Sequence, residues 1–181
     1  RYGANVGASW QLDLWGGIRR NVEANEASML ASAANLAGVR LSQQTILATT
    51  YFQLRVLDAQ KSLLAATVAA YQRSLALTEN RYKAGISGKS DVAVSRTQLE
   101  STRAQLINLE WQRTQLENAI AVLLARSPSA LNIAAHVNWL IKPPTVPVGV
   151  PSTLLERRPD IAQAERKTAA ANAQIGVATA A

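Results

Sequence analysis

The sequence predicts a mostly α-helical protein built on a long antiparallel coiled-coil hairpin, with one short β-strand in front of it. Two runs within residues 47–123 carry apolar or large side chains at a seven-residue spacing, and a turn containing two glycines separates them. Before these runs, residues 6–14 alternate between apolar and polar or small. A period of 3.5 residues is typical of coiled-coil helices, and a period of two is typical of strands.

The composition of the 181 residues suits long helices better than a thick globular core. Aromatic residues make up only 5% of the chain, whereas alanine recurs throughout. The net charge of +7 raises the question of nucleic-acid binding, but the densest basic runs are two arginine pairs, and a phosphate-binding surface needs a denser cluster. Because charges of both signs are interleaved, we expect a solvated helical face formed by Arg55, Asp58, Lys61, Glu100, Arg103, Glu110 and Arg113.

No arrangement of residues points to catalysis, a cofactor or a metal. The chain has no cysteine, and its single histidine, His136, is expected to be a packing or surface residue. The serines have no histidine partner, and Gly85 and Gly88 lie between helices without the preceding strand of a phosphate loop. We therefore predict that the protein is not an enzyme and needs no cofactor.

The alternating stretch at the N-terminus fits two kinds of strand. Val6, Trp10, Leu12 and Leu14 would share one face. That face could pack in a soluble sheet, or it could meet lipid in a membrane barrel, where Trp10 and Trp15 would lie at the interface. Alternation alone favours the soluble sheet, because barrel strands give a weak signal.

A first helix is predicted from about Ile18 to about Lys83, with Gly38 as the only glycine inside and no proline. Its length would be about 100 Å, which globular domains rarely accommodate. Its seam positions are Leu47, Thr50, Leu54, Leu57, Lys61, Leu64, Val68, Tyr71, Leu75, Thr78 and Tyr82. A second apolar stripe consists of Val56, Leu63, Ala70 and Leu77. Two stripes predict neighbours on more than one side, as in a ring or multi-helix barrel.

The turn at residues 84–91 connects to a second helix from about Lys89 to about Ala125. Its glycines permit a left-handed backbone, and Ser87 or Ser90 is expected to cap the second helix. The seam of this helix contains Val92, Ser95, Leu99, Thr102, Leu106, Leu109, Arg113, Leu116, Ile120 and Leu123. Since this helix would be only about 55 Å long, another segment should continue the layer beyond it.

Beyond residues 126–129, which end the second helix, a connector with four prolines spans residues 142–151. Thr153 and Glu156 have the spacing of a capping box, and Pro159 fits the start of a last helix that runs toward Ala178. Its apolar face is expected to contain Ile161, Ala164, Ala171, Ile175 and Ala178. The chain starts without Met and stops abruptly, so we expect it to be a fragment of a longer protein.

Four stretches of the chain resemble the TolC-like outer membrane efflux proteins, in particular their OprM/NodT-type lipoprotein branch. They are residues 9–16 (Ser-Trp-Gln-Leu-Asp-Leu-Trp-Gly), residues 81–86 (Arg-Tyr-Lys-Ala-Gly-Ile) followed by Asp91-Val92, residues 154–161 (Leu-Leu-Glu-Arg-Arg-Pro-Asp-Ile) and residues 170–178 (Ala-Ala-Asn-Ala-Gln-Ile-Gly-Val-Ala). The third stretch is the most specific, and the four occur in the order of the family.

The resemblance implies a homotrimer whose protomers share one twelve-stranded outer membrane β-barrel and one long periplasmic α-helical barrel. It divides this chain into the end of a barrel strand (1–15), the periplasmic hairpin (16–126), an equatorial region with the proline-rich connector (127–158) and the first helix of a second structural repeat (159–181). The strand would then face lipid through Val6, Trp10, Leu12 and Leu14. The lipidated cysteine of this branch would precede Arg1.

The resemblance also assigns roles at the hairpin tip. Ala84, Gly85 and Ile86 match the turn that docks on a periplasmic membrane-fusion adaptor, with Ile in place of the usual Leu. Asp91 matches an aspartate that helps to hold the tip closed in some relatives, although residues 88–90 depart from the more apolar residues found there.

The implied function is a passive exit duct of a tripartite pump, which exports drugs or other small toxic compounds with an inner-membrane transporter of RND type. One alternative is a periplasmic adaptor or another coiled-coil interaction module, but an adaptor should add a lipoyl-like domain with short strands. A basic helical nucleic-acid-binding protein is a third interpretation, and it predicts an affinity that falls steeply with salt.

Overall fold

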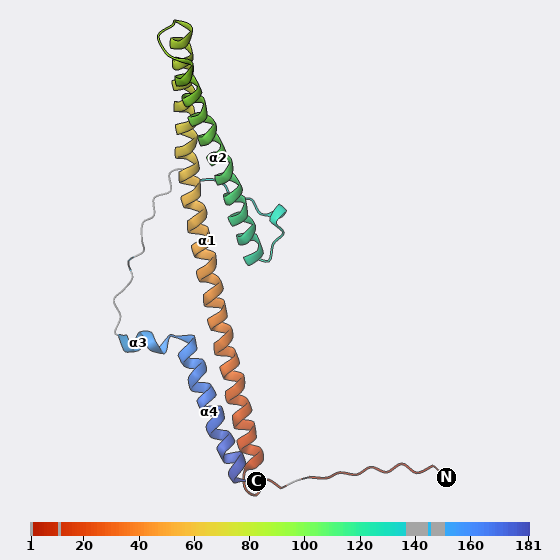
Figure 1. Cartoon of the computed structure of the whole chain (residues 1–181). Coiled ribbons are helices and arrows are strands. Elements are labelled where there is room, and N and C mark those ends of the chain that lie inside the picture. Colours follow the sequence, from red (N-terminus) through yellow and green to blue (C-terminus); the bar gives the residue numbers. More distant parts are fainter. Residues whose placement is uncertain (1, 11, 137–144, 146–150) are drawn as a thin grey trace. The chain divides into compact units, whose positions relative to one another are not determined.

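The computed structural model describes residues 2–10, 12–136, 145 and 151–181. Its helices are α1 (Gly17–Lys83), α2 (Lys89–Leu123), the short 3-10 helix η1 (Pro128–Ala130), α3 (Pro151–Glu156) and α4 (Pro159–Thr179) (Figure 1). The chain forms two compact units, one of Arg1–Ser42 with Thr145–Ala181 and one of Gln43–Pro144. Helix α1 contributes its N-terminal part to the first unit and its C-terminal part to the second.

The predicted ends of α1, α2 and α4 are confirmed to within two residues, whereas Thr153, the predicted cap of α3, lies inside that helix, which begins at Pro151. Helix α1 contains 67 residues without a break, as its lack of proline and its single internal glycine predict. Helix α2 contains 35 residues and is little more than half as long. Among the described helices, none is both long and apolar enough to cross a membrane.

In the second unit, α1 and α2 pack along the seam that the heptad spacing predicts. Leu54 is fully buried, and Val68, Leu99 and Ile120 are at most 9% exposed. The other seam positions are half-buried or buried, with the exception of Tyr82, which is 45% exposed near the tip. The second stripe of α1 is exposed throughout, and Leu63 reaches 71%.

In the first unit, α4 runs alongside the N-terminal part of α1 (Figure 1), and small side chains lie in the contact. A Cβ atom on Gly176 of α4 would meet the Arg20 side chain of α1. Among the described residues of this unit, the buried ones are all alanines, namely Ala24, Ala27 and Ala31 of α1 and Ala173 of α4. A Cβ atom on Gly38 would lie 3.7 Å from Pro159 Cγ, and one on Gly17 would lie 3.4 Å from Ala180 Cβ. Small residues every three or four positions therefore let the two backbones approach closely.

The predicted apolar face of α4 is not the face that packs on α1. Ile161, Ala164, Ala171, Ile175 and Ala178 are all exposed, Ile175 by 63%. The contact with α1 is made instead by small residues such as Ala173 and Gly176, together with Pro159. The larger apolar side chains lie on the faces that α1 does not cover.

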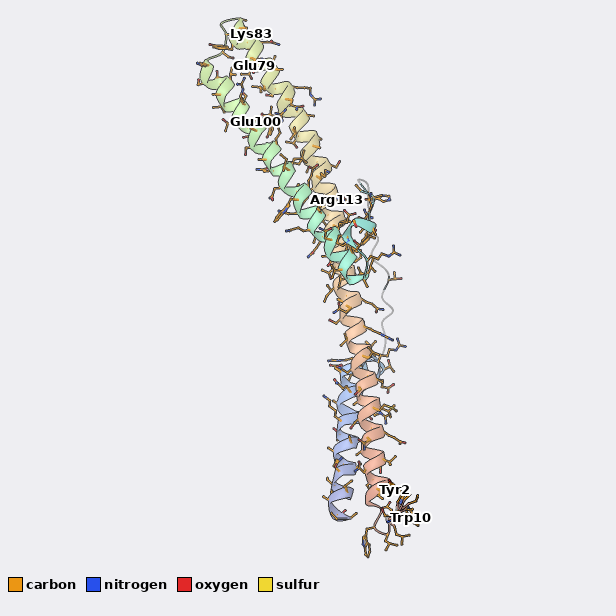
Figure 2. All side chains as sticks on the ribbon, turned by 90° about the vertical axis from the view of Figure 1, so that its right-hand side faces the viewer. Tyr2, Trp10, Glu79, Lys83, Glu100 and Arg113 are labelled. Carbon is orange, nitrogen blue, oxygen red and sulfur yellow. The ribbon has the colours of Figure 1, made fainter. Side chains whose placement is uncertain are left out.

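The N-terminal strand is not formed among the described residues. Residues 2–10 and 12–13 have no regular secondary structure, and the side chains of Tyr2 and Trp10, labelled in Figure 2, are 109% and 84% exposed. A strand needs a neighbouring strand to complete its hydrogen bonds, and the described part of the chain offers none. Asp13 instead accepts the backbone N–H groups of Ile18 and Arg19 at 3.0 and 3.1 Å, which caps the start of α1.

Candidate functional site

The hairpin tip begins after Lys83, the last residue of α1, and Gly85 terminates the helix. Its φ is +75°, and its N–H donates to the carbonyl of Tyr82 at 2.9 Å. The N–H of Ile86 donates to the carbonyl of Arg81, also at 2.9 Å. These two bonds form a Schellman motif, in which a glycine adopts the left-handed conformation and pairs the last carbonyls of the helix. Nothing lies within 4 Å of the position of a Cβ on Gly85, so backbone conformation rather than space favours glycine here.

Helix α2 begins differently from the prediction that Ser87 or Ser90 caps it. Gly88 is the N-cap residue, and no side chain at that position caps the helix. The Asp91 carboxylate reaches back and accepts the N–H of Gly88 at 3.0 Å, close to the positive end of the helix. Within this protomer Asp91 therefore closes the loop locally, and its contact with neighbouring helices stays a prediction.

The tip exposes an apolar residue beside a groove. Ile86 is 76% exposed, and Ala84 and Gly85 are exposed beside it. The groove has a volume of about 660 Å³ and is lined by Tyr82, Lys89, Val92, Ala93, Arg96, Thr97, Glu100 and Ser101. The Arg96–Glu79 ion pair at 2.9 Å joins α2 to α1 next to it. This mixture of apolar and charged side chains at an exposed helix pair suits contact with another protein rather than chemistry.

A second site, which sequence reasoning missed, is a buried charge cluster of Arg55, Asp58, Arg113 and Glu117. The Asp58 side chain is fully buried, and one carboxylate oxygen accepts Arg113 Nε at 2.7 Å while the other accepts Arg55 Nη1 at 2.9 Å. Arg113 Nη1 also donates to Glu117 Oε2 at 2.9 Å. Arg55, Asp58 and Arg113 are predicted to lie on a solvated face, but here they form part of the interior of the hairpin.

The charge cluster also binds residues 131–136, which we call the crossing segment. Arg55 Nη1 donates to the carbonyl of Ala134 at 2.7 Å, and Arg113 Nη2 donates to the carbonyl of Ile133. The backbone N–H of Ile133 donates to Glu117, and that of His136 donates to Asp58 at 3.3 Å. An extended segment without helix or sheet partners thus obtains hydrogen bonds from charged side chains.

The electrostatics of the cluster follow from burial and from these bonds. Burial alone would raise the pKa of the Asp58 carboxyl, but hydrogen bonds from Arg113, from the His136 N–H and from Arg55 outweigh it and lower this pKa below its ordinary value. Burial works against the charge of Arg55, but hydrogen bonding to Tyr51 and to Asp58 raises the pKa of its guanidinium. The Arg55 guanidinium also lies 4.8 Å from the centroid of the Tyr51 ring. Both pKa shifts favour the charged forms of Asp58 and Arg55.

The sequence contains one signal for this cluster. Arg113 falls on a seam position of the heptad pattern, where a charge has to find a partner. Its partner Asp58 lies 55 positions earlier in the chain and directly follows the seam residue Leu57. The contribution of the crossing segment could not be read from the pattern, because residues 131–136 have no helical or strand periodicity.

The remaining predicted site residues lie in the first unit. Val6, Trp10, Leu12 and Leu14 are exposed by between 60% and 101%. Their assignment to a lipid-facing surface stays a prediction. Within the described residues, no group of three His, Cys, Asp or Glu is placed to hold a metal ion.

Comparisons with known proteins show which family has this architecture. The family model of the outer membrane efflux protein matches residues 1–126. The pyoverdine export outer membrane protein OpmQ of Pseudomonas putida is 35% identical over 99% of this chain and 38% of its own length. The cation efflux system protein CusC of Escherichia coli K12 is 30% identical over 99% of this chain and 39% of its own length.

Solved structures agree with this likeness. The structure of the outer-membrane channel OprN superposes with a TM-score of 0.85 and 34% identity, covering 94% of this chain and 39% of that one. The chain thus spans somewhat more than a third of the length of the relatives that it matches. On the family match over residues 1–126, together with the hairpin geometry, the chain belongs to the family of outer membrane efflux proteins.

Proposed function

We propose that the whole protein is the outer membrane exit duct of a tripartite efflux pump and that this chain supplies one hairpin of its wall. In this proposal, three copies assemble into a tube that continues from the outer membrane into the periplasm. Small toxic compounds or drugs pass through it, and an inner-membrane transporter, of RND type, selects them. Relatives named for pyoverdine, cation and solvent export support a duct whose cargo is set elsewhere.

The observation that carries the proposal is the uncovered second stripe of α1. Val56, Leu63 and Leu77 are 48%, 71% and 54% exposed although α2 already covers the seam beside them. Several exposed apolar side chains in one row on a helix mark a surface that meets another protein. A closed ring of helices covers both stripes, which a solitary hairpin cannot do.

The residues at the two ends of the chain have distinct roles in this proposal. Ala84, Gly85 and Ile86 contact a periplasmic adaptor, for which the exposed Ile86 and the left-handed turn at Gly85 provide apolar surface and close backbone approach. Asp91 helps to close the tip against neighbouring helices. At the opposite end, residues 1–15 form part of a barrel strand that faces lipid through the apolar residues named above.

The division of the chain follows from the same proposal. Residues 16–126 form the periplasmic hairpin, residues 127–158 the equatorial region with its connector, and residues 159–181 open a second structural repeat. The packing of α4 on the N-terminal part of α1 supports this order, because α4 covers a part of α1 that lies outside the hairpin unit. Membership of a family of outer membrane efflux proteins argues against the alternative that the protein is a periplasmic adaptor.

The experiment that tests the function is deletion of the full-length gene followed by complementation. Accumulation of a fluorescent pump substrate such as ethidium should rise on deletion and return to the starting level with the full-length protein. The purified full-length protein should be a trimer by light scattering and should conduct ions in planar bilayers. A monomer without conductance, together with unchanged accumulation of ethidium and of a panel of metals and solvents, would contradict the proposal.

A further inference from the structure

We infer that the charge cluster is a clasp that fastens the crossing segment to the hairpin, so that both move as one unit while residues 72–98 around the tip can open separately. This inference concerns how motion is divided along one protomer and goes beyond the proposed export function. It stands on the burial of the cluster, on its bonds to the crossing segment and on the looser packing of the tip.

Hydrogen bonds to charged groups are concentrated at the charge cluster. Asp58 and Glu117 together accept bonds from two arginines and from two backbone N–H groups of the crossing segment. Two carbonyls of the same segment accept bonds from the two arginines. Each of the four side chains therefore links at least two of the three elements α1, α2 and the crossing segment. Hydrogen bonds to charged groups are about twice as strong as neutral ones.

Residues 72–98 around the tip are packed less tightly than the residues around the charge cluster. None of residues 72–98 is buried, whereas Asp58, Ile120 and Ala121 near the cluster are each at most 3% exposed. The ion pairs nearer the tip lie in water: the side chains of Lys61 and Glu110 are 39% and 51% exposed, and those of Arg96 and Glu79 are 63% and 36% exposed. Exposed pairs contribute little because solvent screens them. Regions with few buried contacts open at lower free energy than the rest of a protein.

Apart from its bonds to the charge cluster, the crossing segment makes few contacts that could attach it to the hairpin. In the described part of the chain, residues 131–136 belong to no helix or strand, and Leu131 and Ile133 alone among them are half-buried. Their side chains line an apolar groove of about 500 Å³ with Tyr51, Phe52, Ile120 and Leu124. The attachment of the segment therefore depends on the four charged side chains together with these two apolar contacts.

Hydrogen exchange measured by mass spectrometry on the purified full-length protein tests the inference. In the wild type, the amides of Ile133 and His136 should exchange slowly although they lie outside regular secondary structure, because the carboxylates of Glu117 and Asp58 accept them. In Asp58→Asn, one oxygen cannot serve three donors, so residues 131–136 should exchange about tenfold faster or more. Exchange in residues 72–98 should not change.

Two further variants keep the test decisive. Glu117→Gln retains one acceptor oxygen for two donors, so it should accelerate the Ile133 amide and leave His136 less affected, even if Asp58→Asn fails to fold. Glu110→Gln makes the same chemical change in the exposed pair with Lys61 and should leave the crossing segment as in the wild type. Rapid exchange at Ile133 and His136 in the wild type would overturn the inference. So would a parallel acceleration of residues 72–98 in Asp58→Asn, which would mean that the hairpin opens as a whole. None of these results depends on efflux, so they are distinguishable from a failure of the proposed function.

Discussion

Arg113 on α2 and Asp58 on α1 are joined by a 2.7 Å ion pair in which the aspartate side chain is fully buried and the arginine side chain is 15% exposed. The pair joins one position of α1 to one position of α2 that lies 55 residues later in the chain, and it therefore favours one alignment of the two antiparallel helices. A charged pair in a helical seam specifies register more firmly than apolar residues, which can slide past each other. Its position next to the crossing segment explains why removal of either partner has consequences beyond the pair.

The first prediction concerns the stability of this pair. Asp58→Asn removes the buried charge that Arg55 and Arg113 share, and breaking a buried pair in this way costs about 3 to 5 kcal/mol. Urea unfolding of the full-length protein, followed by circular dichroism at one fixed protein concentration, should show the loss. The matched change Glu110→Gln in the exposed pair should cost less than about 1 kcal/mol. Equal losses in the two variants would show that the Asp58 pair is not special.

The second prediction is the pH dependence of that contribution. The folded-state pKa of Asp58 is lowered, so the unfolded state binds a proton more readily than the folded one. The stability that the ionised carboxylate provides is present above its ordinary pKa of 3.8 and is lost as the pH falls through the lower folded value. The difference in unfolding free energy between wild type and Asp58→Asn should stay constant from pH 5 to pH 8 and shrink below about pH 4. A difference that grows on acidification would contradict the assignment.

Much of this fold could be predicted from the sequence, because helix length and seam are encoded in periodicity. The heptad positions of Leu54, Leu99 and Ile120 predict the buried seam, and the structure confirms it. The face of α4 could not be predicted in the same way. Hydrophobicity points to residues such as Ile161 and Ile175, whereas close packing against α1 selects the smallest side chains, such as Ala173 and Gly176. The described residues before Gly16 form no strand, and a strand there would need a neighbouring strand from outside this hairpin.

The candidate site was predicted in part. The tip residues lie in an exposed turn as expected, since the glycine at position 85 identifies where α1 ends. The charge cluster was missed because interleaved charges on long helices usually lie in water. Only the contact with the crossing segment, which has no periodic pattern, turns Arg55 and Asp58 into interior residues.

The third prediction tests the packing of α4 on α1. Ala24 is 2% exposed in this contact, so Ala24→Leu should overpack it and lower the unfolding free energy by about 1 to 3 kcal/mol. Ala24→Ser nearly preserves the volume and should cost clearly less. Thermal unfolding of the full-length protein compares the two variants. A leucine variant as stable as the wild type would mean that the two helices are not held as closely as described.

The fourth prediction separates contact from backbone strain at the tip. Ile86→Asp places a charge on a side chain that is 76% exposed, so the fold of the protomer should not change. If Ile86 grips an adaptor, this variant should lose at least about tenfold in drug resistance while its amount in the outer membrane, measured by immunoblot, stays normal. Ile86→Leu keeps the apolar surface and should retain resistance. Normal resistance in Ile86→Asp would remove Ile86 from the adaptor contact.

The most direct test of the central claim measures whether the second stripe of α1 is covered in the assembled protein. The described residues of this chain contain no cysteine, so Leu63→Cys and Ile86→Cys each introduce a thiol that a maleimide can report. Both side chains are more than 70% exposed in the single protomer. If the full-length protein forms the proposed tube, then without an adaptor the thiol at position 63 should react at least about tenfold more slowly than the thiol at position 86, because neighbouring helices would cover it. Equal rates at the two positions would contradict the account of this hairpin as part of a closed tube.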